Sequence, residues 1–141
     1  MSTTARAELH VDAPRERLWH ALTDADTISR YLFGTRVETD WREGSPILYR
    51  GEWDGKPYED KGTILEIVPG DRLVTSYYSP LSGKPDEPAS YQRVSYSVAD
   101  DGEGTLVTIT QDGCADDEDA ERMSANWAAV LESMKGVVEE G

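Results

Sequence analysis

The last part of the chain has the clearest pattern of hydrophobic and polar positions. The acidic run 116–119 comes first, and carboxylates suit the free amides and the positive dipole end of a helix start. From Met123 onward, apolar residues recur at steps of three and four, which is the 3.6-residue period of a helix with one buried side. The pattern predicts one long amphipathic helix from 116 to 139, stopping at the terminal glycine, with these residues on its apolar face: Met123, Trp127, Val130, Leu131, Met134, Val137 and Val138.

The first part of the chain predicts one strand and two short helices. Residues 5–11 alternate apolar and polar side chains, which is typical of a half-buried strand. Residues 12–14, Asp-Ala-Pro, then supply a capping side chain and a proline suited to a first helical turn. A second short helix is expected after Asp24 or Asp26 and ends at Gly34. The apolar residues of the two helices are Leu18, Trp19, Ala21, Leu22, Ile28, Tyr31 and Leu32.

The middle of the chain reads as strands and turns. Turns are expected at 42–45, 54–57, 69–71 and 100–104, where Gly, Pro and Asp cluster. Residues 79–89 contain several prolines and a glycine, so they predict an irregular loop. Because a sheet of this kind cannot bury both faces alone, the long helix is expected to cover it. The predicted strands are 35–41, 46–53, 58–68, 72–78, 90–98 and 105–111.

Length, charge and cysteine content limit the class of protein. A chain of 141 residues fits one domain, 1–141, with room for a sizeable core and a cavity. The net charge of −14 and the absence of a basic cluster argue against a nucleic-acid partner. No apolar run reaches the roughly 18 residues needed to cross a bilayer, and no signal-peptide layout is present, so we expect a cytoplasmic protein without membrane insertion. The lone Cys114 agrees with a reducing compartment.

Candidate catalytic residues are few. His10 and His20 have no partner in sequence, and Cys114 in a predicted turn reads as an exposed or loosely packed thiol rather than a nucleophile. The carboxylates of Glu52, Asp60 and Glu66 could approach one another on neighbouring strands, although strand parity would as easily place them on the wet face. The run 116–119 lacks the glycine-centred spacing of a calcium loop. We therefore expect no catalytic residue, no metal and no cofactor.

The order of these elements, with the residues that carry it, resembles the START or birch-allergen-like superfamily, also called SRPBCC. Within this superfamily, the chain most resembles the family of activator of heat-shock-protein-90 ATPase homologues. The resemblance covers nearly the whole chain, and Asn126 departs from the glycine that is common at this position in the family. The matching segments are AP at 13–14, LWHALT at 18–23, GTILEIVP at 62–69 followed by RL at 72–73, GTLVTITQ at 104–111, NWAAVL at 126–131 and MK at 134–135.

The resemblance implies an α+β helix-grip fold, in which a curved antiparallel seven-stranded sheet wraps around the long C-terminal helix and two short helices follow the first strand. It also implies a pocket for an apolar small molecule between helix and sheet. Strand alternation supports such a pocket. Of Tyr77 and Tyr78, we expect Tyr77 to point inward, because it shares strand parity with Leu73. Core packing is the commoner role for any one of these side chains. The expected lining residues are Trp41, Tyr77, Tyr96, Ile109, Gln111, Met123, Trp127 and Leu131.

Three functions are compatible with the sequence and with this resemblance. The first is non-catalytic binding of an apolar or aromatic molecule, a lipid among the candidates, in the pocket. The second, suggested by the family name, is an interaction module with a chaperone partner in a stress response. The third is a cyclase or dehydratase that uses polar residues of the pocket, such as Tyr96 or Gln111. A monomer or a homodimer is compatible with each of them, and the loop 79–89 is the expected lid of the pocket.

Overall fold

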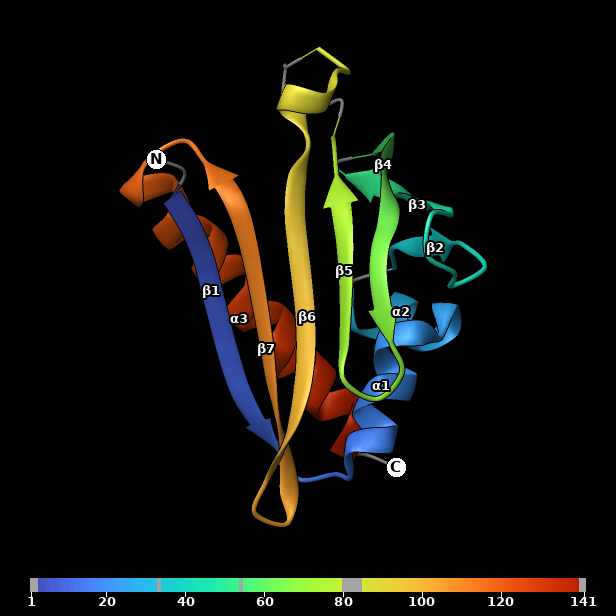
Figure 1. The fold of residues 1–141 in the computed structure, drawn as a ribbon, viewed down its shortest axis with the longest axis vertical. Helices are drawn as coiled ribbons and strands as arrows, with labels where there is room; N and C mark the ends of the chain where they lie inside the picture. Colours follow the sequence, from blue (N-terminus) through green and yellow to red (C-terminus); the bar gives the residue numbers. More distant parts are fainter. Residues whose placement is uncertain (1–2, 33, 54, 80–84, 140–141) are drawn as a thin grey trace.

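The computed structural model describes residues 3–32, 34–53, 55–79 and 85–139. It confirms the α+β helix-grip fold, with one strand, two short helices, six further strands and a long C-terminal helix (Figure 1). In chain order the elements are β1 (Thr3–Val11), α1 (Arg15–Thr23), α2 (Ala25–Tyr31), β2 (Arg36–Glu38), β3 (Pro46–Trp53), β4 (Lys56–Val68), β5 (Arg72–Tyr77), the 3-10 turn η2 (Pro88–Ser90), β6 (Gln92–Asp101), β7 (Gly104–Cys114) and α3 (Asp117–Glu139).

The seven strands form one antiparallel sheet in the order β1-β7-β6-β5-β4-β3-β2. The register places Tyr96 opposite both Leu73 on β5 and Ile109 on β7. Residues that oppose one another on antiparallel strands share a face of the sheet. Leu73, Tyr96 and Ile109 therefore form one row across the inner face, as strand alternation predicts.

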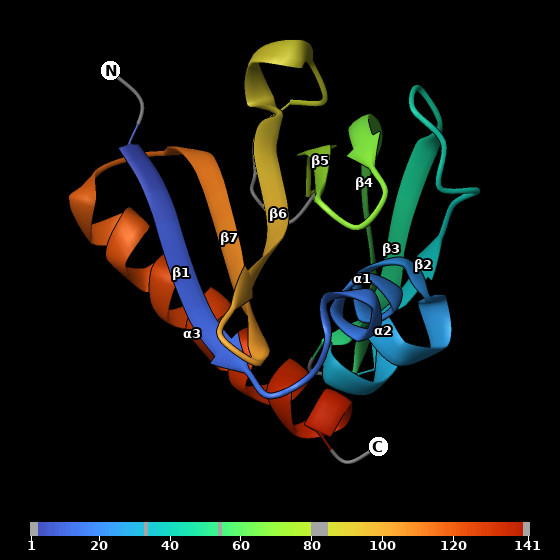
Figure 2. The same cartoon turned by 60° about the horizontal axis from the view of Figure 1, so that its bottom comes forward.

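Helix α3 lies along one half of this inner face. It packs mainly against β1, and it also contacts β7, α1 and α2 (Figure 2). The β3 to β5 half of the sheet stands across from it. Within the described ranges, no helix is long and apolar enough to span a bilayer. Because α3 covers the sheet unequally, its position determines where a cavity can lie between helix and sheet.

The core joins the sheet, the two short helices and the C-terminal half of α3. Leu18, Ile64, Ile109, Leu131 and Met134 are each at most 1% exposed. Complete burial of an apolar side chain of this size contributes about 1.5–3 kcal/mol. The core is therefore concentrated at the end of the molecule where α1, α2 and α3 meet.

The helix starts differ in part from the sequence expectation. The Oδ2 atom of Asp24 accepts from the amide of Thr27 at 3.1 Å and caps α2, so of the two predicted starting points the helix follows Asp24. Asp116 caps α3 in the same way, with its Oδ1 atom 2.8 Å from the amide of Asp119. The predicted cap of α1 is wrong, because Pro14 occupies the N-cap position and makes no side-chain hydrogen bond there. The carboxylate of Asp12 instead contacts the ring of His10 at 2.9 Å.

Several strand ends also differ from the prediction. The strand expected over 35–41 is limited to Arg36–Glu38, and Trp41 has a φ of 61°, a left-handed conformation that a strand cannot contain. Pro57 was expected in a turn but lies in β4 opposite Glu52. It is tolerated there because β4 pairs with β5 only further along the chain.

The connections around β6 differ as well. Strands β6 and β7 continue almost to the turn at Gly102, so the predicted turn 100–104 is shorter than expected. Of the irregular loop expected over 79–89, Pro88 and Ala89 belong to η2. Residues 80–84 of this loop and the helix stop predicted at Gly141 lie outside the described residues.

Candidate functional site

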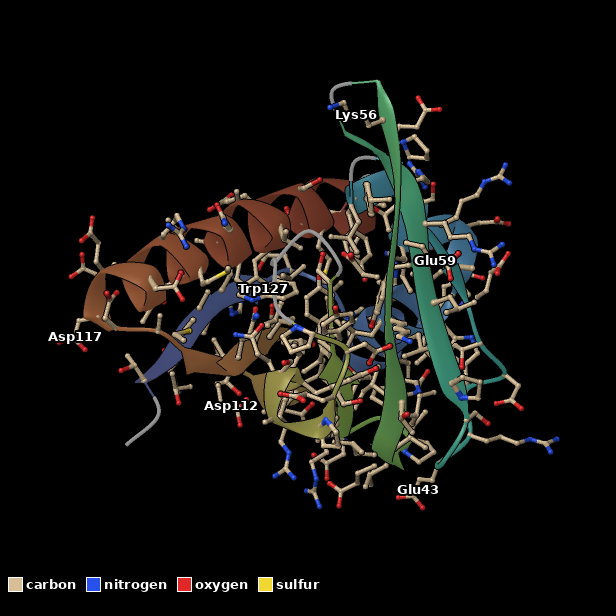
Figure 3. The ribbon with its side chains drawn as sticks, turned by 90° about the horizontal axis from the view of Figure 1, so that it is seen from above. Glu43, Lys56, Glu59, Asp112, Asp117 and Trp127 are labelled. Carbon is tan, nitrogen blue, oxygen red and sulfur yellow. The ribbon has the colours of Figure 1, made fainter. Side chains whose placement is uncertain are left out.

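A cavity of about 980 Å³ lies between α3 and the inner face of the sheet. Figure 3 shows Trp127 in this space, on the side of α3 that faces the strands. Strands β3 to β7 supply one wall, and the N-terminal half of α3 supplies the other. The described lining residues are Leu32, Thr35, Tyr49, Tyr58, Asp60, Tyr77, Tyr78, Ser79, Ser90, Gln92, Val94, Tyr96, Gln111, Gly113, Ala115, Asp116, Glu118, Asp119, Arg122, Met123, Asn126, Trp127 and Val130.

The structure brings most of the expected lining residues together. Tyr77, Tyr96, Gln111, Met123 and Trp127 all line the cavity, and Tyr78 lines it beside Tyr77. The other three lie elsewhere. Trp41 and Ile109 border a separate void of about 30 Å³ deeper in the core. Leu131 is 1% exposed and packs in the core, outside the described lining.

Trp127 is held in place by the last strand. Its indole Nε1–H donates to the Oε1 atom of Gln111 at 2.8 Å. The Nε2 atom of Gln111 in turn donates to Gln92 Oε1 at 2.7 Å. The ring of Tyr96 meets the indole edge to face, with ring centroids 5.9 Å apart. These contacts fix both the position and the tilt of an aromatic surface in the cavity wall.

A second polar group lies on the opposite wall. The Tyr77 hydroxyl donates to the Oδ2 atom of Asp60 at 2.5 Å. The Tyr49 ring packs edge to face on Tyr77, with ring centroids 6.0 Å apart. Tyr49 is on β3, directly opposite Asp60 on β4. Asp60 is only 8% exposed. The wall therefore combines two phenol rings with one buried carboxylate.

Three tyrosines of the cavity, Tyr49, Tyr77 and Tyr96, remain neutral. Burial raises the pKa of Tyr49 to about 12. Burial also raises the pKa of Tyr96, and burial together with the hydrogen bond to Asp60 raises the pKa of Tyr77. All three phenols are therefore protonated at neutral pH and act as hydrogen-bonding groups rather than as bases.

One end of the lining is exposed and acidic. Asp116, Glu118, Arg122 and Asn126 are exposed, and Asp119 is partly exposed. The guanidinium of Arg122 forms an ion pair with Asp119 one turn earlier on α3. We call these five residues the mouth of the cavity. Carboxylates outnumber cations at this mouth, in keeping with the charge of the whole chain.

The structure corrects two expectations about titratable residues. His10 does have partners, because its ring nitrogens contact Asp12 at 2.9 Å and Asp101 at 2.8 Å. His20 lies 3.6 Å from Asp24. Cys114 is not exposed but 5% accessible, since it packs with Ala5 and Ala120 at the end of β7. Burial raises the pKa of its thiol, which disfavours the thiolate form.

The three carboxylates on neighbouring strands separate in the structure. Glu66 pairs with Arg72 on the outer surface, because an irregularity in the β4–β5 register after Ile64 reverses the strand alternation. Glu52 is exposed, whereas Asp60 points inward. Within the described part of the chain, no group of three or more His, Cys, Asp or Glu side chains could hold a metal ion. Besides its acidic mouth, the cavity thus offers hydrogen bonds, aromatic surface and one buried carboxylate, that of Asp60.

Sequence reasoning left the role of Asp60 open and missed Tyr49 and Tyr58 as lining residues. A signal for Asp60 was present, since it shares strand parity with Gly62 and Ile64, both buried. The same strand parity indicates that Tyr58 lines the cavity. Tyr49 lines it because it lies opposite Asp60 in the hairpin of β3 and β4. The hairpin register that links these residues is a structural result.

A family model described as activator of Hsp90 ATPase homolog 1-like protein matches residues 12–139. The chain belongs to this family. The match spans all of the elements that build the cavity, from α1 to α3. No curated protein matches the chain in sequence.

Solved structures share the fold of this chain. The solution structure of ChR145 from Cytophaga hutchinsonii is 40% identical, covers 98% of this chain and 94% of its own, and gives a TM-score of 0.86. CalU16 from Micromonospora echinospora is 21% identical, with coverage of 98% and 86% and a TM-score of 0.73. DynU16, assigned to the dynemicin biosynthetic locus, is 18% identical with a TM-score of 0.79, and 96% of this chain matches 47% of that one. The last two likenesses concern the fold alone.

Proposed function

We propose that this family member binds an apolar or aromatic small molecule in the cavity between α3 and the sheet, without converting it. The cavity itself supports the proposal. Its volume of about 980 Å³ is at the upper end of the roughly 300–1,000 Å³ typical of small-molecule sites. An aromatic wall with a few fixed polar groups is also the usual composition of such sites.

The energetics favour a ligand with a large apolar surface. Removal of apolar area from water contributes about 25 cal/mol per Å². Tyr96 and Trp127 are already held at a fixed angle by their edge-to-face contact and by Gln111. A ligand that stacks on them would therefore lose little further side-chain entropy of the protein on binding.

Titration with a neutral apolar fluorophore tests this proposal. N-phenyl-1-naphthylamine is expected to bind with one equivalent per chain and to gain fluorescence. Asn126→Trp places a bulky ring at the mouth and should weaken binding at least tenfold. Ala125→Trp is the matched control, because Ala125 is exposed on α3 and lies outside the described lining. Equal affinity of both variants and the parent protein would contradict binding in this cavity.

One observation favours a second candidate function. Tyr77 and Asp60, joined by a short hydrogen bond, form an acid–base pair that faces the cavity. Such a pair could transfer a proton to a bound substrate. A cyclase or dehydratase would then lose turnover on Tyr77→Phe or Asp60→Asn, with substrate binding retained. Tyr96→Phe and Gln111→Leu extend this test to the other polar groups of the wall. Binding without turnover in the parent protein would exclude this candidate.

The chaperone partner that the resemblance implied stays a prediction. Among the described residues, one large hydrophobic side chain is exposed, that of Leu65 at 43%. A single exposed side chain does not form an apolar docking patch for a partner protein. Co-purification with the chaperone and stimulation of its ATPase would establish this partner.

A further inference from the structure

Asp60 has one carboxylate oxygen without a protein partner. Its Oδ2 atom accepts from Tyr77, but Oδ1 is buried and makes no hydrogen bond with the described residues. The residue is 8% exposed and lines the cavity. A buried acceptor left unsatisfied costs about 1–3 kcal/mol, and more when it is charged. Such a group in a cavity wall is expected to have a partner in the ligand.

Two basic side chains near Asp60, one on β4 and one on β3, have other partners. Lys61 forms an ion pair with Asp86. Arg50, on the neighbouring strand β3, pairs with Glu38 at 3.3 Å and with Glu59 at 3.1 Å on the outer surface. No ion pair of the described residues includes Asp60. The protein therefore supplies no cation for this carboxylate within the described part of the chain.

The surroundings of Asp60 suit a positive charge. The rings of Tyr49 and Tyr77 lie beside it and have electron-rich faces, which attract ammonium groups at distances up to about 6 Å. At the mouth, Asp116, Glu118 and Asp119 are accompanied by Arg122 alone among the described lining residues. The field of these groups, with a net charge of −14 on the chain, attracts cations and repels anions.

We propose that the ligand is an amine: an apolar or aromatic skeleton with one protonated amino group, whose N–H donates to Oδ1 of Asp60 among the tyrosine rings. This inference rests on the proposed binding function and names the chemical class of ligand. It also sets an order of preference. Amines bind more tightly than neutral analogues of the same shape, and anions such as fatty acids bind least.

Three probes with one skeleton test this order. These are 9-(aminomethyl)anthracene, 9-anthracenemethanol and 9-anthracenecarboxylate, titrated by isothermal calorimetry at pH 7. We expect the amine to bind at least tenfold more tightly than the alcohol, and the alcohol more tightly than the acid. Asp60→Asn should remove the preference for the amine and leave the affinity of the alcohol within threefold. Asn keeps the shape of the side chain and can still accept from Tyr77.

Glu59→Gln is the matched control, because it removes the same charge from the neighbouring residue on the outer surface (Figure 3). It should leave all three affinities unchanged. Equal affinities of amine and alcohol in the parent protein would overturn this inference while the proposed binding function stands. A preference for the amine that persists in Asp60→Asn would also overturn it. Binding of none of the three probes would contradict the binding function, and the inference with it.

Discussion

The indole Nε1–H of Trp127 donates a 2.8 Å hydrogen bond to Gln111, which joins α3 to the last strand across the cavity wall. Gln111 is 4% exposed, and its other amide atom donates to Gln92. Both ends of the amide are therefore satisfied in a buried position. This chain of hydrogen bonds sets the orientation of the aromatic surface that a ligand would meet.

Gln111→Leu removes this link and leaves the indole N–H of Trp127 without its acceptor. This donor is only partly buried, so we expect a cost of about 1 kcal/mol, the lower end of the roughly 1–3 kcal/mol of an unsatisfied buried group, in the free energy of unfolding in urea. Gln92→Leu removes the outer bond to Gln111 and an exposed 3.2 Å bond to the Gly113 carbonyl. It leaves the bond between Trp127 and Gln111 intact and should cost less. Equal stability of Gln111→Leu and the parent protein would show that the bond does not fix Trp127.

Tyr77→Phe deletes the hydroxyl that donates to Asp60. Both buried carboxylate oxygens then lack a donor among the described residues, and we expect the free energy of unfolding to fall by about 1–3 kcal/mol. Tyr91→Phe serves as the control, because its hydroxyl donates to the exposed Asp86 at 2.7 Å. Its cost should stay within about 0.5 kcal/mol. A Tyr77→Phe variant as stable as the control would argue against a buried, tightly held carboxylate.

The sequence predicts the fold well because each element has a strong local pattern. Strand β3 has the predicted bounds, since its alternation is regular between two turns. Trp41 was placed wrongly in a strand, because a left-handed φ at a non-glycine residue has no sequence signal. The inward direction of Asp60 and the outward direction of Glu66 depend on a register irregularity between β4 and β5. Features set by contacts between strands cannot be read from one strand.

Gly62 is required by the close approach of β4 and β5. A Cβ at this position would lie 1.8 Å from the carbonyl oxygen of Ser76, which is backbone and cannot move aside alone. Gly62→Ala should therefore destabilise the protein by at least about 1–3 kcal/mol, the usual cost of overpacking. Gly136 in α3 has no atom within 4 Å of the same position, so Gly136→Ala should stabilise by about 0.5–1 kcal/mol. Thermal unfolding measures both, and a tolerated Gly62→Ala would contradict the described strand spacing.

His10 predicts a pH dependence of stability. Hydrogen bonds to Asp101 and Asp12 raise the pKa of its ring above the ordinary 6.5. The stabilising contribution of the protonated ring is therefore complete below about pH 6.5, the unfolded value, and disappears as the pH rises through the higher folded value. An NMR titration of the His10 ring should give a pKa above 6.5. Asp101→Asn should lower it, and an unchanged value would contradict the predicted role of this pair.

Binding of a small molecule between α3 and the sheet can be followed at Trp127. The most direct measurement follows the tryptophan indole N–H resonances by ¹⁵N NMR during titration with 9-(aminomethyl)anthracene. Trp127 lines the cavity and Trp19 lies on α1 outside its described lining. We expect the Trp127 resonance to shift and to saturate at one equivalent, whereas the Trp19 resonance stays in place. An unmoved Trp127 resonance, or equal shifts of both, would contradict binding in this space.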